Sequence, residues 1–187
     1  MSQDTAETEW TIGLYAFSSD APSYDRIAKA SLSFIAPSEI LLCIVVNEGL
    51  AEFGGQVFER IANEAFELHD WTFGLAFADR VERQPDFHVL GLDNGKLGAD
   101  EQTALNAWYM AQPEVKFTKL RGVYPLMLLN EQQRKQPCGS GKTLGEYIEA
   151  QSAQSTEQRG KLLLWRIPPE DIEGVRAELS QGDALIG

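Results

Sequence analysis

Residues 40–46 form an unbroken run of seven apolar side chains, and this run limits the fold more than any other feature of the sequence. A run of this length fits a strand that is covered on both faces, in the interior of a sheet. It is too short to cross a membrane, which takes about 20 apolar residues. With 187 residues, 43% of them hydrophobic, the chain is long enough to build a core around such a strand.

The periodicity of apolar residues predicts the other elements. Alternation predicts strands at residues 10–17, 71–77, 87–92, 115–120 and 161–167. Helical spacing predicts helices at residues 57–68, 100–109, 125–133, 143–150 and 172–179. Residues 24–31 have helical spacing, although an alternating pattern begins near their end. An Asn-Gly pair at 94–95 predicts a tight turn.

This order of elements favours the α+β class, with a mixed or mainly antiparallel sheet packed by four to five helices. We expect residues 1–9 to be a disordered acidic tail and residues 10–187 to form a single domain. The polar composition of residues 150–159 predicts a mobile loop near them.

The charge of the chain is unevenly distributed. The net charge is -12, yet residues 1–93 hold 16 acidic and 5 basic residues, while residues 115–142 hold six basic residues and one acid. An acidic protein repels phosphates, so nucleic acid is an unlikely partner. The acidic first half instead favours a basic protein partner.

The compartment is inferred from the N-terminus and the two cysteines. Residues 1–9 carry acids and no base, unlike a secretory signal or a transit peptide. Cys43 lies in the apolar run and Cys138 in a polar, glycine-rich loop, so we expect two free thiols. These features favour a cytoplasmic protein. They leave a homo-oligomer open.

Acidic residues cluster in and around the helix expected at residues 57–68. The candidate binding surface consists of Glu59, Glu64, Glu67 and Asp70. A solvated helix face is the ordinary interpretation of such a cluster, and a contact surface for a basic protein is the functional one.

Residues 139–143 read Gly-Ser-Gly-Lys-Thr and end like a phosphate-binding loop. The first glycine of that motif is replaced by Gln136, and no buried strand leads directly into the loop. We therefore expect a loop that caps a helix, with Thr143 as N-cap and Glu146 completing a capping box. Gly141, Lys142 and Thr143 remain candidates for holding a single anion.

His69, His88 and the cysteines lack the paired spacing of a metal site, so we expect no metal or cofactor. A cysteine hydrolase would need a depressed pKa at Cys138, and an exposed loop thiol is the simpler interpretation. No catalytic constellation stands out.

The leading hypothesis is a non-enzymatic protein-binding module that engages a basic partner, as bacterial immunity and inhibitor proteins do. The alternative is an enzyme or small-ligand or anion-binding protein, with a site near His69–Asp70 and the Cys138–Lys142 loop.

Overall fold

The computed structural model describes residues 8–17, 25–27, 30–36, 39–47, 64, 71–80, 95, 98–151 and 155–186. The chain divides into two compact units. Unit 1 comprises Met1–Trp71 and Ala76–Leu97, and unit 2 comprises Thr72–Leu75 and Gly98–Gly187. The expectation of a single domain stays a prediction, and each unit is described by itself.

Unit 1 contains a four-stranded antiparallel sheet in the order β2-β3-β4-β1. Its strands are β1 (Thr8–Phe17), β2 (Asp25–Ile27), β3 (Ala30–Ala36) and β4 (Glu39–Asn47). The apolar run lies in β4, between β3 and β1, with Ile44 opposite both Ile12 and Ala30. Its interior position in the sheet is therefore confirmed.

Two expectations for the first half of unit 1 differ from the structure. The helical spacing of residues 24–31 is overridden, because β2 and β3 pair with each other and β3 pairs with β4. Strand pairing with a neighbour outweighs local spacing here. Strand β1 also begins at Thr8, so the last two residues of the expected tail are in the sheet.

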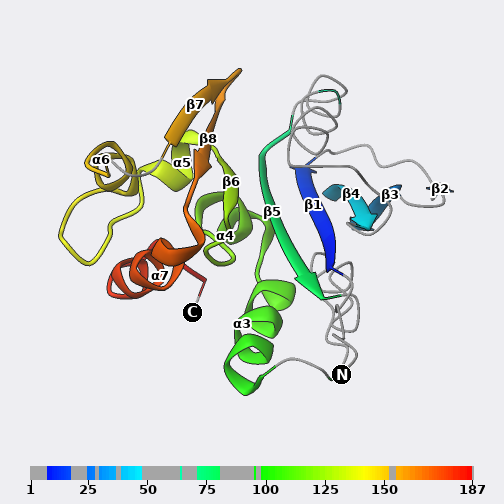
Figure 1. The fold of residues 1–187 in the computed structure, drawn as a ribbon, viewed down its shortest axis with the longest axis horizontal. Coiled ribbons are helices and arrows are strands. Elements are labelled where there is room, and N and C mark those ends of the chain that lie inside the picture. The colour runs from blue at the N-terminus through cyan, green and yellow to red at the C-terminus, as the bar shows by residue number, and fades with distance from the viewer. Residues whose placement is uncertain are drawn as a thin grey trace, which may run out of the picture. The chain divides into compact units, whose positions relative to one another are not determined.

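Unit 2 combines antiparallel strands with helices, as Figure 1 shows. Its strands are β6 (Leu126–Leu129), β7 (Ser155–Arg159) and β8 (Leu162–Arg166), and β5 (Phe73–Arg80) contributes its first residues. The strand order is β5-β6-β8-β7. The helices are α3 (Ala99–Met110), α4 (Pro113–Thr118), α5 (Glu131–Arg134), α6 (Leu144–Glu149), the 3-10 helix η3 (Pro169–Asp171) and α7 (Ile172–Ser180). The α+β class is thus confirmed.

Three segments of unit 2 were predicted wrongly. The strand expected at residues 115–120 is helix α4, because Pro113 stands at its first position, where its fixed φ favours a helix. The helix expected at residues 125–133 is strand β6 followed by α5, because β6 pairs with β8. Residues 155–159, placed in the expected loop, form β7 beside β8.

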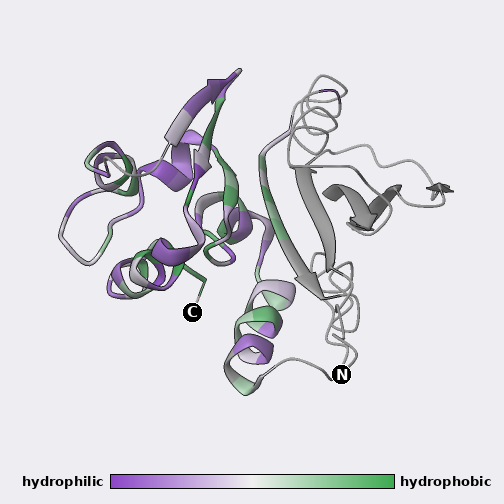
Figure 2. Ribbon diagram, in the orientation of Figure 1, coloured by the Kyte–Doolittle hydropathy of each residue, from purple (hydrophilic) through white to green (hydrophobic). Residues whose placement is uncertain are grey.

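The core of unit 2 gathers around Trp165, which is fully buried with Leu144 and Leu179 from α6 and α7. Outside this core, the ring of Trp108 in α3 packs edge-to-face against the ring of Phe73, with ring centroids 5.5 Å apart. The strand expected at 161–167 and the helices expected at 100–109, 143–150 and 172–179 are confirmed. Figure 2 shows that β8 is largely hydrophobic and β7 largely hydrophilic.

Some expected elements lie outside the described residues. The helix at residues 57–68 is described only at Glu64, which is helical, and the strand at residues 87–92 is not described. Gly95 of the expected turn has a φ of 72°, as a tight turn requires. Within the described part of the chain, no helix has the length and apolar character needed to cross a membrane.

Candidate functional site

The loop at residues 136–143 is a small antiparallel turn that leads into α6. The N–H of Cys138 donates to the carbonyl of Lys142 at 2.7 Å, and the N–H of Gly141 donates to the carbonyl of Cys138 at 3.1 Å. Gly141 has a φ of 76°, which glycine adopts without steric cost. The glycine-rich sequence therefore forms a hydrogen-bonded turn.

The capping box predicted at Thr143 is present. The Glu146 carboxylate accepts from the Thr143 N–H at 2.8 Å and from its hydroxyl at 2.9 Å, and Thr143 Oγ1 accepts from the Glu146 N–H at 3.2 Å. The backbone hydrogen bond, followed by the hydroxyl bond, lowers the pKa of Glu146. The carboxylate of Glu146 thus already occupies the N–H that Thr143 would offer to an anion.

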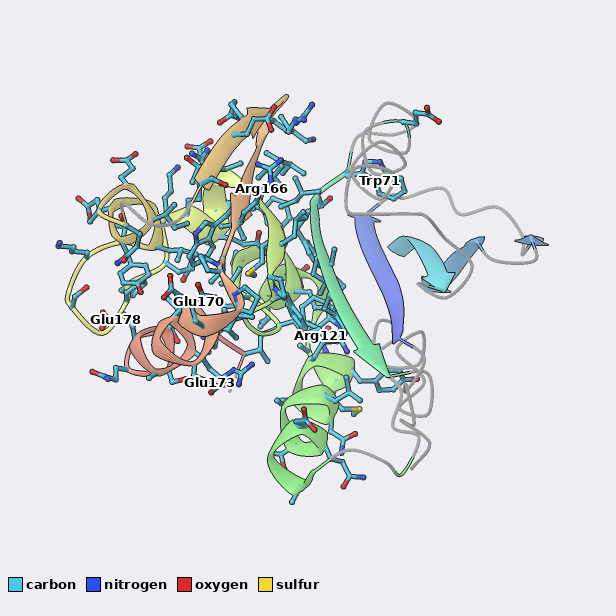
Figure 3. All side chains as sticks on the ribbon, in the orientation of Figure 1. Trp71, Arg121, Arg166, Glu170, Glu173 and Glu178 are labelled. Atoms are coloured by element: carbon cyan, nitrogen blue, oxygen red, sulfur yellow. The ribbon has the colours of Figure 1, made fainter. Side chains whose placement is uncertain are left out.

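The same loop is bound to the C-terminal end of α7. The N–H of Gly139 donates to the Glu178 carbonyl at 3.1 Å, and the N–H of Ser140 donates to Glu178 Oε1 at 2.6 Å. Figure 3 labels Glu178 where α7 faces this loop. Two carboxylates of the chain itself, Glu178 and Glu146, therefore bind the amides of the loop.

The candidate anion residues Gly141, Lys142 and Thr143 are adjacent in this turn, with Gly141 and Lys142 exposed. An anion would compete with Glu146 for Thr143, and with Glu178 for the neighbouring amide of Ser140. Anion binding at these three residues stays a prediction.

The expectation that Cys138 is an exposed thiol is wrong. Its exposed fraction is 4%, and it packs in the core with Leu144 and Leu179. Desolvation by burial, followed by the nearby Glu178 carboxylate, raises the pKa of Cys138 to about 11. The cysteine is free, as expected, and the protonated thiol is its stable form at neutral pH. This environment is the reverse of what a nucleophilic cysteine needs.

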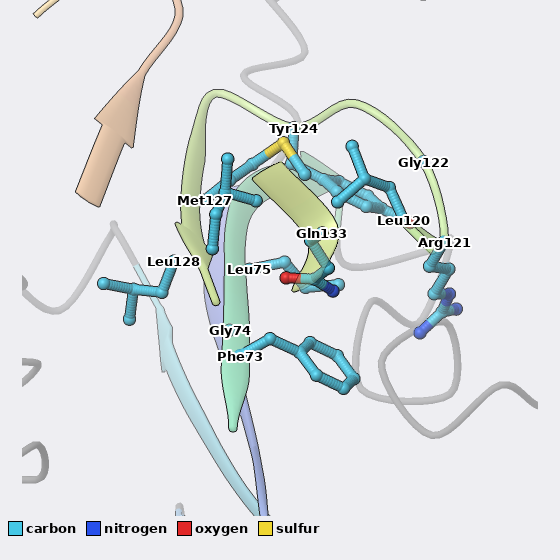
Figure 4. Close-up of a pocket in the computed structure, with 11 residues that line it drawn as sticks. Phe73, Gly74, Leu75, Leu120, Arg121, Gly122, Tyr124, Met127, Leu128 and Gln133 are labelled. Carbon is cyan, nitrogen blue, oxygen red and sulfur yellow. The ribbon is translucent and has the colours of Figure 1, made fainter. Parts of the chain in front are cut away.

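A pocket in unit 2 lies between β5, β6 and the segment that follows α4. Phe73, Leu120, Tyr124, Met127 and Gln133 are among its lining residues, as Figure 4 shows. The volume available in it is about 10 Å³, roughly what one water molecule needs, whereas ligand pockets usually hold about 300–1,000 Å³. The pocket is therefore small for an organic substrate.

The sequence analysis counted two buried basic residues only as part of a basic stretch, and one of them, Arg121, lines this pocket. Lys116 and Arg121 are each 7% exposed, and both lie over the ring of Trp108. Lys116 Nζ is 5.6 Å and Arg121 Cζ is 5.8 Å from the ring centroid. The aromatic face attracts both cations and offsets part of their cost of burial.

The candidate acidic surface is described at one residue. Glu64 is helical and exposed, while Glu59, Glu67 and Asp70 lie outside the described residues, as do both histidines. His69 and Asp70 belong to unit 1 and the Cys138–Lys142 loop to unit 2. The two-segment site of the alternative hypothesis therefore stays a prediction.

The division into units sorts the charges of the chain. Unit 1 holds 16 acidic and 6 basic residues, whereas unit 2 holds 12 acidic and 10 basic residues. The net charges are -10 and -2, so nearly all of the excess acidity belongs to unit 1.

Comparison with protein-family models, with curated proteins and with solved structures finds no match to this chain. Among the described residues, no three His, Cys, Asp or Glu side chains are grouped so that they could hold a metal ion.

Proposed function

We propose that this protein is a non-enzymatic binding module that engages a basic protein, in the manner of an immunity or inhibitor protein. The observation that carries the proposal is the separation of charge between the units. A net charge of -10 on unit 1, beside a nearly neutral unit 2, concentrates the negative potential on one part of the chain. Such a field speeds the encounter with a positively charged partner.

The contact residues proposed for this surface are Glu59, Glu64, Glu67 and Asp70. The exposed, helical Glu64 supports this choice, because its carboxylate is accessible from solvent. The other three follow the helical spacing of the sequence.

The experiment uses the full chain as bait in a lysate of its host at low and at high ionic strength. The variant that tests the surface carries Glu59→Gln, Glu64→Gln, Glu67→Gln and Asp70→Asn. A matched control neutralises four exposed acids of unit 2, with Glu114→Gln, Glu131→Gln, Glu149→Gln and Glu170→Gln. Both variants lose four negative charges, so only the place of the charges differs.

We expect a basic protein to be retained by the wild type and by the control, and to be lost with the test variant or when salt screens the charges. Capture that is equally strong with the test variant, or the absence of any basic protein at low salt, would contradict the proposal.

A further inference from the structure

Strand β7 is the last strand in the sheet order of unit 2, and in the described part of the chain it pairs only with β8. Residues 155–158 are exposed, and Figure 2 shows the strand in the colour of hydrophilic residues over most of its length. The strand contains no proline, and its register with β8 is regular, without a bulge. Proline and bulges are two common protections of an edge strand against pairing with another chain.

The pairing with β8 determines which main-chain groups face the open edge. Arg159 and Leu162 are opposite each other around the turn at Gly160 and Lys161. A two-residue turn is closed by a hydrogen-bonded pair, and such pairs alternate with non-hydrogen-bonded ones. The N–H and C=O groups of Thr156 and Gln158 therefore point away from β8, toward the edge.

We propose that this edge pairs with the same edge of a second copy of the chain, antiparallel and about a two-fold axis at Gln158. The two Gln158 residues would exchange N–H···O=C bonds, because their main-chain groups are the outward ones. The register then places Glu157 of each copy opposite Arg159 of the other. The pairing joins the two sheets into one antiparallel sheet with an isologous interface.

The charges of β7 favour this register. Glu157 and Arg159 carry opposite charges and lie on the same face of the strand, joined by an ion pair of 3.0 Å. With the two-fold axis at Gln158, Glu157 of each copy lies opposite Arg159 of the other. Opposite charges in such cross-strand pairs stabilise a sheet. An axis at Thr156, the other outward residue, would place Glu157 opposite Ser155 and gain no ion pair.

The side chains of the edge leave room for these bonds. Gln158 Nε2 donates to the carbonyl of Gly160 at 2.7 Å, and a carbonyl has a second lone pair for the N–H of Thr156 from the other copy. Arg159 contacts Glu157 of its own chain through one nitrogen, and a guanidinium carries five N–H donors.

The test measures self-association of the full chain by sedimentation equilibrium. Glu157→Arg and Arg159→Glu each place like charges opposite each other in a homodimer, so each variant is expected to associate at least about tenfold more weakly than the wild type. An equimolar mixture of the two variants restores opposite charges between copies, although each chain still lacks its Glu157–Arg159 ion pair and Glu157→Arg also breaks the 3.4 Å ion pair with Arg166. We expect the mixture to form a heterodimer at about wild-type strength.

Glu173→Arg and Arg176→Glu are the matched controls, because these residues form an exposed ion pair on α7, which lies apart from β7 in Figure 1. They should leave self-association unchanged. Circular dichroism identifies any variant that fails to fold. Such a variant is replaced by Thr156→Pro, which removes an outward N–H without changing the charge. Thr156→Pro should also weaken association. A wild type that stays monomeric at millimolar concentration would overturn the proposal, as would a mixture that associates no better than its components.

Discussion

The backbone N–H of Ser140 donates to the Oε1 atom of Glu178 at 2.6 Å, which ties the glycine-rich loop before α6 to the end of α7. The residues are 38 positions apart in the sequence, so this bond helps to hold two distant segments together. The loop resembles a phosphate cradle in its composition, yet the anion it binds is a carboxylate of its own chain.

Replacing Glu178 by Ala should destabilise unit 2 by about 1 kcal/mol, because a charge-assisted hydrogen bond to Ser140 is lost. Glu178→Gln keeps an oxygen acceptor and should cost less. Urea unfolding of the full chain measures both. Equal losses for the two variants would show that the charge adds nothing to this bond.

The contact between this loop and α7 also predicts an asymmetry between two glycines. A Cβ on Gly182 would collide with the Pro137 carbonyl and would come within 2.7 Å of Cys138 Cα, whereas a Cβ on Gly174 in the first turn of α7 would meet nothing within 4 Å. We expect Gly182→Ala to lower the free energy of unfolding by about 2 kcal/mol or more. Gly174→Ala should raise it by about 0.5–1 kcal/mol, since Ala favours the helix. Thermal unfolding of both variants checks the sign, and a neutral Gly182→Ala would contradict the tight contact.

Burial of Cys138 predicts a loss of stability at high pH. Its pKa is raised from 9.0 to about 11 in the folded protein, so the unfolded chain releases the proton first. The raised pKa of Cys138 adds to the free energy of unfolding in full below pH 9. As the pH rises to about 11, this addition falls by up to about 3 kcal/mol.

The measurement is the free energy of unfolding of the wild type and of Cys138→Ala between pH 8 and pH 11. Because burial also raises the pKa of Tyr124 and of Tyr147, the wild type loses stability for several reasons. Only the difference in free energy of unfolding between the wild type and Cys138→Ala reports on Cys138, and this difference should shrink as the pH rises. A difference that is constant with pH would refute the shift.

Two capping boxes of unit 2 should differ in strength because one is buried. Asn130 Oδ1 accepts from the N–H of Gln133 at 2.8 Å, and Nδ2 of Asn130 donates to the Phe117 carbonyl at 2.9 Å. Asn130→Ala removes both bonds from a residue that is 6% exposed and should cost about 2–3 kcal/mol. Thr143→Ala, at the partly exposed cap of α6, should cost about 1 kcal/mol. Chemical denaturation ranks the two, and the reverse ranking would contradict the role of burial.

The sequence predicted correctly those structural features that depend on residues close together in the chain. The Thr143 cap lies three residues from its partner Glu146, and the interior position of β4 follows from seven consecutive apolar side chains, so both were predictable. Leu126–Leu129 has a spacing that also suits a helix, and it becomes a strand because β8, more than 30 residues later, pairs with it. Pairing over such a distance leaves no trace in local periodicity.

The candidate sites show the same difference between local features, which were predicted, and long-range contacts, which were not. The turn at residues 139–143 was identified from its glycines, but the burial of Cys138 comes from α7 packing over it, which no local pattern encodes. Lys116 and Arg121 were counted only as part of a basic stretch, because only the folded chain places both over Trp108.

Strand β5 has a consequence for how this protein can be divided. Thr72–Leu75 belongs to unit 2, although the residues on both sides of it belong to unit 1. A gene fragment that starts at Gly98 therefore omits Phe73, the ring that Trp108 packs against. During synthesis Phe73 leaves the ribosome before Trp108, so the contact between the two rings forms only after Trp108 has emerged. Unit 2 is thus not one continuous segment of the sequence, and no single cut in the gene separates it whole from unit 1.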